Sequence, residues 1–427
     1  MPGDTIFALS SGRPPAAISV IRISGPLAHD AGTLVAGALP EPRTAAVREL
    51  HDPASGELLD QALVLRFDSP ASSTGENIVE LQCHGGRAVV DALLAVLTSV
   101  EGLRVAEPGE FTRRAFENGR IDLTEAEGLA DLIEAETESQ RKAALALAEG
   151  GLRKQIAEWQ THLLGLSAEA ERAIDYDEDD EQVDPALQRA CGALAAELQS
   201  WLARPRAERL KDGVRVVVAG PPNAGKSSIL NALAGEDRAI VTDVPGTTRD
   251  HIEVPLSLGG VPIVLTDTAG LRESSDQIEA IGIARAESLV ESADVLVWLG
   301  NPDEAPRHPR VVRVRPKADL GDSGALPPEE GIAVSAITGQ GLSELAHHIG
   351  MFAKALLPTE TAVSLNRRQG ELVAIAHAAL GQASHCDDLV LIAEHMRTAR
   401  SAFDRVTGRA GVEGVLDALF SRFCLGK

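Results

Sequence analysis

The octapeptide Gly220-Pro-Pro-Asn-Ala-Gly-Lys-Ser227 constrains the fold of this chain more than any other segment. It matches the pattern GxxxxGK[ST] in full, follows the apolar run Val214 to Ala219, and opens a helical pattern over residues 228–233. A strand, a glycine-containing loop and a helix in this order form a phosphate-binding loop, whose backbone N–H groups face the phosphates of a nucleotide. We therefore expect a Ras-like P-loop α/β domain built around this loop.

Further short motifs give the predicted nucleotide site its chemistry. Lys226 should reach the β- and γ-phosphate oxygens, and the Ser227 hydroxyl should coordinate Mg²⁺. Asp267, at the end of the apolar run 261–266, suits Mg²⁺ coordination through water, and the Gly270 N–H suits the γ-phosphate. Thr248 can add a hydroxyl to Mg²⁺ when the γ-phosphate is present, which predicts a nucleotide-sensitive switch loop.

The base-recognition motif departs from the usual Asn-Lys-x-Asp pattern. Pro316-Lys-Ala-Asp319 occupies its position, so Asp319 can accept hydrogen bonds from guanine and Lys317 can lie over the ring. Pro316 supplies neither a side-chain amide nor a backbone N–H. Ser335-Ala-Ile337 fits the loop whose amides contact guanine O6. We predict GTP binding with weakened affinity, and equal competition by ATP would contradict this.

The hydrolytic residues are less clear from sequence alone. Leu271 stands where Ras-type GTPases place a water-orienting Gln, so charge neutralisation and water positioning must come from other groups. The Asn223 side chain, with groups of Thr242, Val244 and Thr247, could hold a monovalent cation near the phosphates. Glu279 is a candidate general base, although an ordinary surface helix position explains it equally simply.

The order of strand and helix patterns along the chain predicts that one domain is discontinuous in sequence. Residues 1–118 mix short strand patterns with a helical run, as in an α+β domain, and residues 119–211 are helical. Within them we expect one long helix over 125–149, capped by Thr124 and Glu127 and ended by Gly150-Gly151. Strand and helix patterns alternate over 212–355, and helices return over 356–427. An α/β domain is therefore predicted to be inserted between two halves of a helical domain.

The net charge limits the possible partners of the 427-residue chain. It has 40 Lys+Arg against 63 Asp+Glu, a formal charge of −23, which argues against a non-specific nucleic-acid coat. Residues 356–427 instead hold eight basic and eight acidic side chains. Their arginines are either solvated helix faces or a docking surface for an anionic partner: Arg367, Arg368, Arg397, Arg400, Arg405 and Arg409. Four Cys without a CxxC pair, no secretion signal and no long apolar segment predict a cytoplasmic protein without a membrane span.

Several motifs together resemble the MnmE (TrmE) family of tRNA-modification GTPases. In the nucleotide domain they are Asn-Ala-Gly-Lys-Ser-Ser, Gly-Thr-Thr-Arg-Asp and Asp-Thr-Ala-Gly-Leu-Arg-Glu, which related ribosome-assembly GTPases share. The segments that single out this family lie at the two ends of the chain: Ile21-Arg-Ile-Ser-Gly25, Glu80-Leu-Gln-Cys-His-Gly-Gly86, Pro108-Gly-Glu-Phe-Thr-Arg-Arg-Ala115 and Phe423-Cys-Leu-Gly-Lys427. The resemblance covers essentially the whole chain.

The resemblance implies a folate-binding and dimerising domain at 1–118 and a potassium-dependent GTPase that is activated when two such domains pair. It implies a homodimer that works on tRNA with an FAD-dependent flavoprotein, MnmG (GidA), in a heterotetramer or larger complex. The reaction it implies adds an aminomethyl-type group to carbon 5 of the wobble uridine, with 5-formyl- or methylene-tetrahydrofolate as the one-carbon source.

The resemblance also assigns residues. It supports Asn223, Thr242, Val244 and Thr247 as K⁺ ligands, Ser227 and Thr248 as Mg²⁺ ligands, and Glu279 as general base beside Lys226. It places Arg22, Glu80, Arg120 and Lys427 at the folate, although a Lys is common where Arg120 stands, and it suggests that Cys424 assists the one-carbon chemistry. The residues predicted to contact GTP are Asn223, Ala224, Gly225, Lys226, Ser227, Ser228, Thr242, Asp243, Val244, Pro245, Gly246, Thr247, Thr248, Asp267, Thr268, Ala269, Gly270, Lys317, Asp319, Ser335, Ala336 and Ile337.

Two other interpretations remain open at this point. A ribosome-assembly GTPase would be an RNA-binding switch, but no GXXG-bearing module follows the nucleotide domain here. A folate-binding regulator with a vestigial GTPase is favoured by Pro316 and disfavoured by Lys226, Ser227, Thr248 and Asp267. A GTPase assay in KCl and in NaCl would distinguish them.

Overall fold

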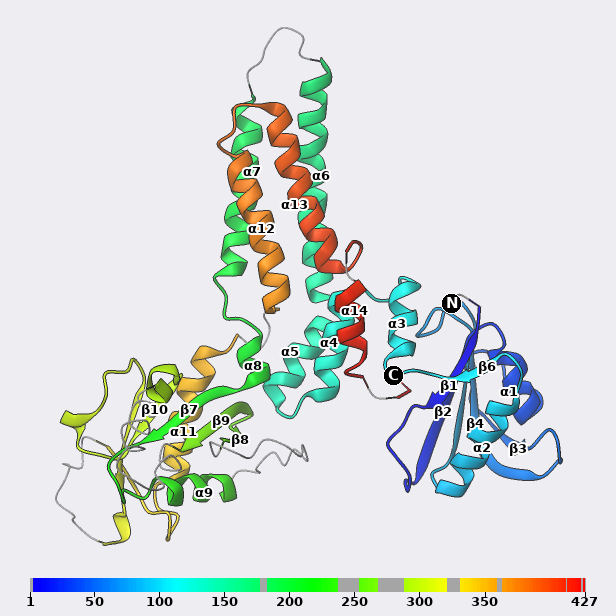
Figure 1. Ribbon diagram of the computed structural model, residues 1–427, viewed down its shortest axis with the longest axis horizontal. Coiled ribbons are helices and arrows are strands. Elements are labelled where there is room, and N and C mark those ends of the chain that lie inside the picture. Colours follow the sequence, from blue (N-terminus) through cyan, green and yellow to red (C-terminus); the bar gives the residue numbers. More distant parts are fainter. Residues whose placement is uncertain are drawn as a thin grey trace, which may run out of the picture. The chain divides into compact units, whose positions relative to one another are not determined.

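A computed structural model describes residues 3–176, 183–236, 253–267, 288–320, 331–358, 363–411, 413–423 and 425–426 (Figure 1). The chain forms two compact units. The first comprises Met1–Ala130 with Asp404–Lys427, and the second comprises Asp131–Phe403. Each unit is described by itself below.

The first unit is built on a six-stranded mixed sheet with the order β3-β4-β5-β2-β1-β6. Only the β1–β6 pair is parallel among the described strands. Apolar residues of α1 and α2 cover one face and form the core with the inward-facing strand residues. The elements are β1 Thr5–Leu9, β2 Ile18–Ser24, α1 Ala28–Ala36, β3 Ala46–His51, β4 Leu58–Phe67, β5 Ile78–His84, α2 Arg87–Ser99, β6 Leu103–Val105, α3 Glu110–Glu117 and α14 Glu413–Phe420.

The opposite face of this sheet carries α3 and the C-terminal segment. Phe111 of α3 packs with Ile6 and Ala8 of β1 in a small buried cluster. Phe420 and Phe423 pack with the first residues of α4 (Leu123–Glu134) in another. Gly109, with φ 72°, precedes α3, and an added Cβ there would lie 2.4 Å from the Phe420 carbonyl oxygen. A glycine is therefore required for this close approach.

The helical part of the second unit includes four long helices, seen side by side in Figure 1. Trp159 of α6 is fully buried and lies 5.3 Å from Trp201 of α7 and 5.7 Å from Phe403 of α13, measured between ring centroids. Its indole N–H donates to Glu197 at 2.8 Å, which satisfies the buried donor. The helices are α5 Glu138–Ala148, α6 Gly151–Tyr176, α7 Pro185–Leu202, α8 Glu208–Asp212, α12 Arg367–Ala383 and α13 Leu389–Thr407.

The predicted long helix over 125–149 is wrong. The structure has two helices there, α4 and α5, which are separated at residues 135–137. Thr137 begins α5 with a capping box to Gln140, and this reciprocal pairing favours a new helix start over continuation. The first helix is capped by Asp122, which exchanges hydrogen bonds with Glu125, rather than by Thr124 and Glu127.

The inserted α/β part has the strand order β12-β11-β10-β7-β9-β8, and β8 is antiparallel to β9 while the other described pairs are parallel. The order reverses on either side of β7, so the carboxyl end of β7 is the topological switch point where such sheets bind ligands. The elements are β7 Val214–Ala219, α9 Lys226–Glu236, β8 Glu253–Leu258, β9 Val261–Asp267, β10 Val295–Trp298, β11 Val311–Pro316, β12 Ile332–Val334 and α11 Leu342–Leu356, with short 3₁₀ turns at Pro302–Glu304 and Ala318–Leu320.

The chain leaves the helical part and returns to it at one place. The Ala207 N–H donates to the Leu365 carbonyl oxygen at 3.2 Å, and the Arg367 N–H donates to the Glu208 carboxylate. The predicted insertion of an α/β domain into a helical one is thus confirmed as the chain order of the fold.

Candidate functional site

The phosphate loop lies at the carboxyl end of β7, as the sequence predicts. Gly220 has φ 155°, and an added Cβ would lie 3.0 Å from Leu299, so a side chain cannot be accommodated there. Asn223 has φ 61°, a left-handed conformation that Asn tolerates better than most residues. Gly225 has φ 94° and leads into Lys226, the first residue of α9. The loop therefore wraps around a point at the N-terminus of a helix, where anions bind favourably.

Lys226, Ser227 and Asp267 converge at this point. Lys226 is 7% exposed, and its ammonium donates to the carbonyl oxygens of Gly220 at 3.0 Å and Pro221 at 2.9 Å. The Ser227 hydroxyl donates to the Asp267 carboxylate at 2.5 Å, so two oxygens from β9 and α9 meet. A hydroxyl beside a buried carboxylate is the oxygen donor set that Mg²⁺ prefers, and the residues present fit that ion. Ala224 is buried and Ser228 exposed in the same segment.

Eleven other residues predicted to act at the phosphates and metal ions lie outside the described residues. These are the predicted switch, potassium-binding and general-base positions: Thr242, Asp243, Val244, Pro245, Gly246, Thr247, Thr248, Thr268, Ala269, Gly270 and Glu279. Their roles stay predictions.

The predicted base-recognition residues come together from two separate loops. Asp319 follows β11 and Ser335 follows β12, and the Ser335 hydroxyl donates to the Asp319 carboxylate at 2.5 Å. Ser335 is fully buried and also accepts from the N–H groups of Ile337 and Thr338, which shapes the loop containing Ala336. Lys317 has φ 61°, so the chain turns sharply after Pro316 to present Asp319. A strained non-glycine residue is typical of a functional loop.

Replacing Pro316 with Asn is expected to tighten GTP binding by about tenfold, because the new amide restores one neutral hydrogen bond worth about 1 kcal/mol or slightly more. The matched control is Pro302→Asn, at the start of another short turn of the same domain. Equilibrium titration with a fluorescent GTP analogue measures the effect. Unchanged affinity in Pro316→Asn would show that Pro316 does not limit binding.

A second candidate site lies on the face of the first unit's sheet that carries α3. Arg22 of β2 and Glu80 of β5 are register partners, and the Arg22 Nε and a terminal nitrogen lie 2.9 and 2.8 Å from the Glu80 Oε1. The Arg22 guanidinium lies over the Phe111 ring, 5.6 Å from its centroid. Phe111 is not among the residues predicted for this site, although it lies in the family motif Pro108 to Ala115. Only the tertiary structure reveals this stacking.

The other predicted folate residues are less closely joined. Arg120 is exposed and lies beside Gly75. Gly426 lies against the Leu9 carbonyl, one register position from the pairing of Ala8 with Arg22. Gly426 therefore lies beside β1, whereas Cys424 and Lys427 lie outside the described residues. Burial raises the pKa of the Cys83 thiol to about 11, which makes it a poor nucleophile.

An ion network centred on the buried Arg114 supports this side of the first unit, and no sequence pattern predicts it. Arg114 is 8% exposed and donates to Asp4, Glu76 and Glu110 at 2.8 to 3.2 Å. Arg104 also bonds to Asp4 and Glu110. Burial alone would raise the pKa of Glu110, but hydrogen bonds from Arg104, the Glu107 N–H and Arg114 outweigh it, and the pKa is lowered. Next to this network, the Ser24 hydroxyl bonds to Thr74 and Glu76.

Comparison with known proteins gives full-length relatives. The tRNA modification GTPase MnmE of Zymomonas mobilis is 51% identical over 432 residues, covering 99% of this chain and 100% of the relative. The protein of the same name from Erythrobacter litoralis is 51% identical over 427 residues, with 99% and 100% covered. Among solved structures, the G domain of the T. maritima FeoB iron transporter is 27% identical and covers 33% of this chain and 98% of its own; its TM-score of 0.23 is too low to carry an argument.

The strand order around β7, the phosphate loop and the Asp319–Ser335 pair define a P-loop GTPase with a Ras-like α/β domain. Two family models match most of the chain: the GTP-binding protein TrmE N-terminus over residues 5–120 and the MnmE helical domain over residues 123–424. The chain belongs to the MnmE (TrmE) family of tRNA-modification GTPases, and it is a GTP hydrolase of that family. None of the described helices is both long and apolar enough to cross a membrane.

Proposed function

We propose that this chain is the GTP-hydrolysing component of a system that modifies carbon 5 of the wobble uridine of tRNA with an aminomethyl-type group. The system would use a tetrahydrofolate one-carbon unit and an FAD-dependent MnmG (GidA) partner. The observation that carries the proposal is the convergence of Lys226, Ser227 and Asp267 at one sheet edge, in a chain that matches its relatives end to end. The names of those relatives supply the link to tRNA.

In the proposed nucleotide site, Lys226 would bind the β/γ-phosphate oxygens, and Ser227, Thr248 and Asp267 are the residues that would hold Mg²⁺, Asp267 through water. Bound Mg²⁺ would neutralise charge that develops on the phosphates. Asn223, Thr242, Val244 and Thr247 would hold K⁺, and Glu279 would accept the proton of the attacking water. These assignments agree with the short Ser227–Asp267 hydrogen bond and with the left-handed backbone of Asn223 in the loop.

In the proposed folate site, the Glu80 carboxylate would accept hydrogen bonds from the pterin N–H groups, and Arg120 and Lys427 would contact the glutamate tail. Arg22, which is paired with Glu80 at 2.8 Å, would hold that carboxylate in position and contact the same end of the ligand. Cys424 is proposed to assist the one-carbon chemistry. A Cys424→Ser variant that keeps GTPase activity but loses tRNA modification is expected, and full modification by that variant would remove Cys424 from the mechanism.

We also propose the assembly and the domain limits. The chain would act as a cytoplasmic homodimer, with a folate-binding and dimerisation domain over 1–118, helical segments over 119–211 and 356–427, and the GTPase domain over 212–355. The exposed Arg397 and Arg400 of α13 would contribute to tRNA docking, although Arg397 is also paired with Glu394 in the same helix. Much of the tRNA affinity would come from the flavoprotein partner, since this chain carries a charge of −23.

A steady-state GTPase assay in KCl and NaCl at equal ionic strength tests the potassium site. Turnover at least about tenfold faster in KCl is expected, since the cation replaces an arginine finger. Equal rates in the two salts would contradict the potassium site, and no turnover in either salt would favour the vestigial-GTPase interpretation.

Replacing Arg22 with Ala tests the folate site independently. Mass spectrometry of wobble uridine from a deletion strain that expresses the variant should show modification reduced by more than tenfold, because the ligand loses a charge-assisted contact. The GTPase rate of purified Arg22→Ala should stay within twofold of the unsubstituted protein. Arg48→Ala, on the edge strand β3, is the matched control and should leave both readouts unchanged. Normal modification by Arg22→Ala would refute the site.

A further inference from the structure

The first turn of α5 contacts the inserted α/β part through two different groups. Thr137 is the N-cap, so Ser139 and Gln140 occupy the second and third helical positions. Backbone N–H groups at these positions have no acceptor within the helix and need partners elsewhere. The Ser139 N–H finds its acceptor in the α/β part, whereas the Gln140 N–H bonds to the Thr137 hydroxyl and the Gln140 side chain makes the second contact. Both contacts lie within the second unit.

The Ser139 N–H donates to the carbonyl oxygen of Gly260 at 3.2 Å. Gly260 lies at the tip of the hairpin that joins β8 to β9, where Leu258 and Val261 are register partners. Gly259 and Gly260 have φ values of 58° and 80°, the positive pair of a two-residue type I′ turn. Such a turn is short and stiff, so the Gly260 carbonyl is a fixed extension of β9.

The Gln140 side chain bonds to the segment that leads into the neighbouring strand, β7. Its Nε2 donates to the Leu210 carbonyl oxygen at 2.9 Å, while its Oε1 accepts from the N–H groups of Glu136 and Thr137. Leu210 belongs to α8, which runs directly into β7. Lys211 of α8 also pairs with Asp131 and Glu134 of α4, at 3.3 and 3.5 Å. One helical turn therefore holds the amino ends of both β7 and β9.

The carboxyl ends of these two strands hold the nucleotide site. β7 ends at the phosphate loop and β9 ends at Asp267, and the two strands pair from Val214–Ile263 to Val218–Asp267. Both are largely buried, so each moves as a stiff unit. Seven residues of β9 span roughly 20 Å, at about 3.3 Å per residue. A displacement at Asp267 is thus carried along β9 to Gly260.

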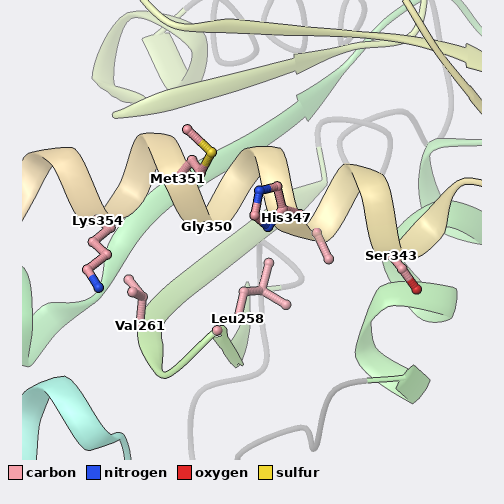
Figure 2. A pocket seen from close by; sticks show the side chains of 9 residues that line it. Leu258, Val261, Ser343, His347, Gly350, Met351 and Lys354 are labelled. Atoms are coloured by element: carbon pink, nitrogen blue, oxygen red, sulfur yellow. The ribbon is translucent and has the colours of Figure 1, made fainter.

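The packing around the hairpin tip leaves room for such a displacement. In Figure 2, Leu258 and Val261 lie beside the face of α11 that carries His347, and these residues line an open cavity of about 550 Å³. A second cavity, of about 270 Å³, is lined by Ser139, Ala143 and Leu210 on the α5 side. Both cavities open to solvent, so the hairpin tip and the start of α5 are enclosed by other side chains on only part of their surface, and tighter packing would resist a shift more strongly.

We propose that the first turn of α5 reads the nucleotide state of the GTPase domain through the Ser139–Gly260 and Gln140–Leu210 hydrogen bonds. A change in the position of Asp267 between the GTP-bound and GDP-bound states would move β9 together with its ladder partner β7, and with them the hairpin tip and α8. The first turn of α5, held at both points, transmits the shift into α5 and the helices that follow. The proposed contacts lie at the amino ends of β7 and β9, and the nucleotide site lies at the carboxyl ends of the same strands.

Two substitutions break the two contacts while preserving the helix. Ser139→Pro removes the N–H, and proline is tolerated in the first helical turn because that N–H has no acceptor in the helix. Gln140→Glu keeps the acceptor oxygen of the capping box but replaces the donor to Leu210 with a repelling oxygen. Ser139→Ala is the matched control, because it retains the backbone N–H.

Hydrogen exchange of the full-length protein, followed by mass spectrometry in KCl, tests the proposal without tRNA or folate. For the unsubstituted protein and Ser139→Ala, exchange at residues 140–146 should differ at least about threefold between GDP and GDP with aluminium fluoride. Ser139→Pro and Gln140→Glu should lose this difference while hydrolysing GTP within twofold of the normal rate. If Ser139→Pro does not fold, Gln140→Glu carries the test.

Several results would overturn the proposal. Equal exchange in the two nucleotide states of the unsubstituted protein would show that α5 does not sense the nucleotide. A difference that persists in Gln140→Glu would show that the signal takes another route. Loss of GTP hydrolysis in both variants would show that these contacts serve the nucleotide site itself.

Discussion

Replacement of Lys226 by alanine is expected to lower the rate of GTP hydrolysis by about 10²- to 10³-fold, the usual cost of removing one preorganised charge stabiliser. The ammonium is buried at the N-terminus of α9 and is held by the Gly220 and Pro221 carbonyl oxygens. It is therefore positioned before substrate arrives, so its contribution needs no reorganisation of the loop. Single-turnover hydrolysis at saturating GTP and Mg²⁺ measures the loss in the chemical step.

The matched control for Lys226→Ala is Lys154→Ala, which removes an exposed lysine of α6. That variant should hydrolyse GTP at the normal rate. Circular dichroism of both variants should match the unsubstituted protein. If Lys226→Ala retained more than a tenth of the normal rate at saturating GTP, the placement of the phosphate chain against this loop would be wrong.

Replacement of Arg114 by methionine is expected to destabilise the first unit by about 3 kcal/mol, the lower end of the cost of breaking a buried ion pair, because it removes a shared partner of the buried Glu110 and the half-buried Asp4 and Glu76. Arg114 bonds to Asp4, Glu76 and Glu110, and Arg104 can compensate at only two of these. The slowest-exchanging amides of β1 and β2 report this opening in the full-length protein. Their exchange should accelerate by roughly 10²-fold or more, the equivalent of about 3 kcal/mol.

The neighbouring Arg113 provides the control. It pairs with Asp417, whose side chain is 77% exposed, and such exposed pairs contribute about 1 kcal/mol or less. Arg113→Met should therefore change the same exchange rates by less than about tenfold. Equal effects of the two substitutions would indicate that packing of the side-chain stems, rather than the buried ion network, stabilises α3.

The ion network also sets a pH dependence. The pKa values of Asp4 and Glu110 are lowered in the folded state because bonds from Arg104 and Arg114 outweigh the effect of burial. A lowered folded-state pKa adds stability that is full above the unfolded pKa, about 4, and is lost as the pH falls through the folded pKa. The difference in the free energy of unfolding between the unsubstituted protein and Arg114→Met should therefore become smaller below about pH 4.

The nucleotide site could be predicted because its residues are local in sequence. The octapeptide from Gly220 to Ser227 contains its own glycines, lysine and hydroxyl, and its strand and helix flank it directly. Asp267 could be added because it ends an apolar strand. The pairing of Asp319 with Ser335, by contrast, joins two loops sixteen residues apart, and only their separate assignment to the guanine base indicated that they meet.

The failures have equally specific causes. The break between α4 and α5 was missed because residues 125–149 are rich in strong helix formers, and the capping box of Thr137 and Gln140 overrides that propensity. Phe111 was missed because no spacing of residues in the sequence indicates that Arg22 stacks on its ring. The network around Arg114 gathers residues from the N-terminus, a loop, β6 and α3, and no sequence pattern brings such distant positions together.

The hydrogen bond between Ala207 and Leu365 joins the two ends of the α/β part, so this part can be treated as a separable module of the fold. Its two ends lie side by side, so a short turn joining residues 206 and 366 should close α7 onto α12 and leave a continuous helical protein. The excised module, with adjacent termini, is suited to circular permutation. In evolutionary terms, a complete GTPase could enter a loop of an older helical protein at little conformational cost, since long insertions add only slowly to loop-closure entropy.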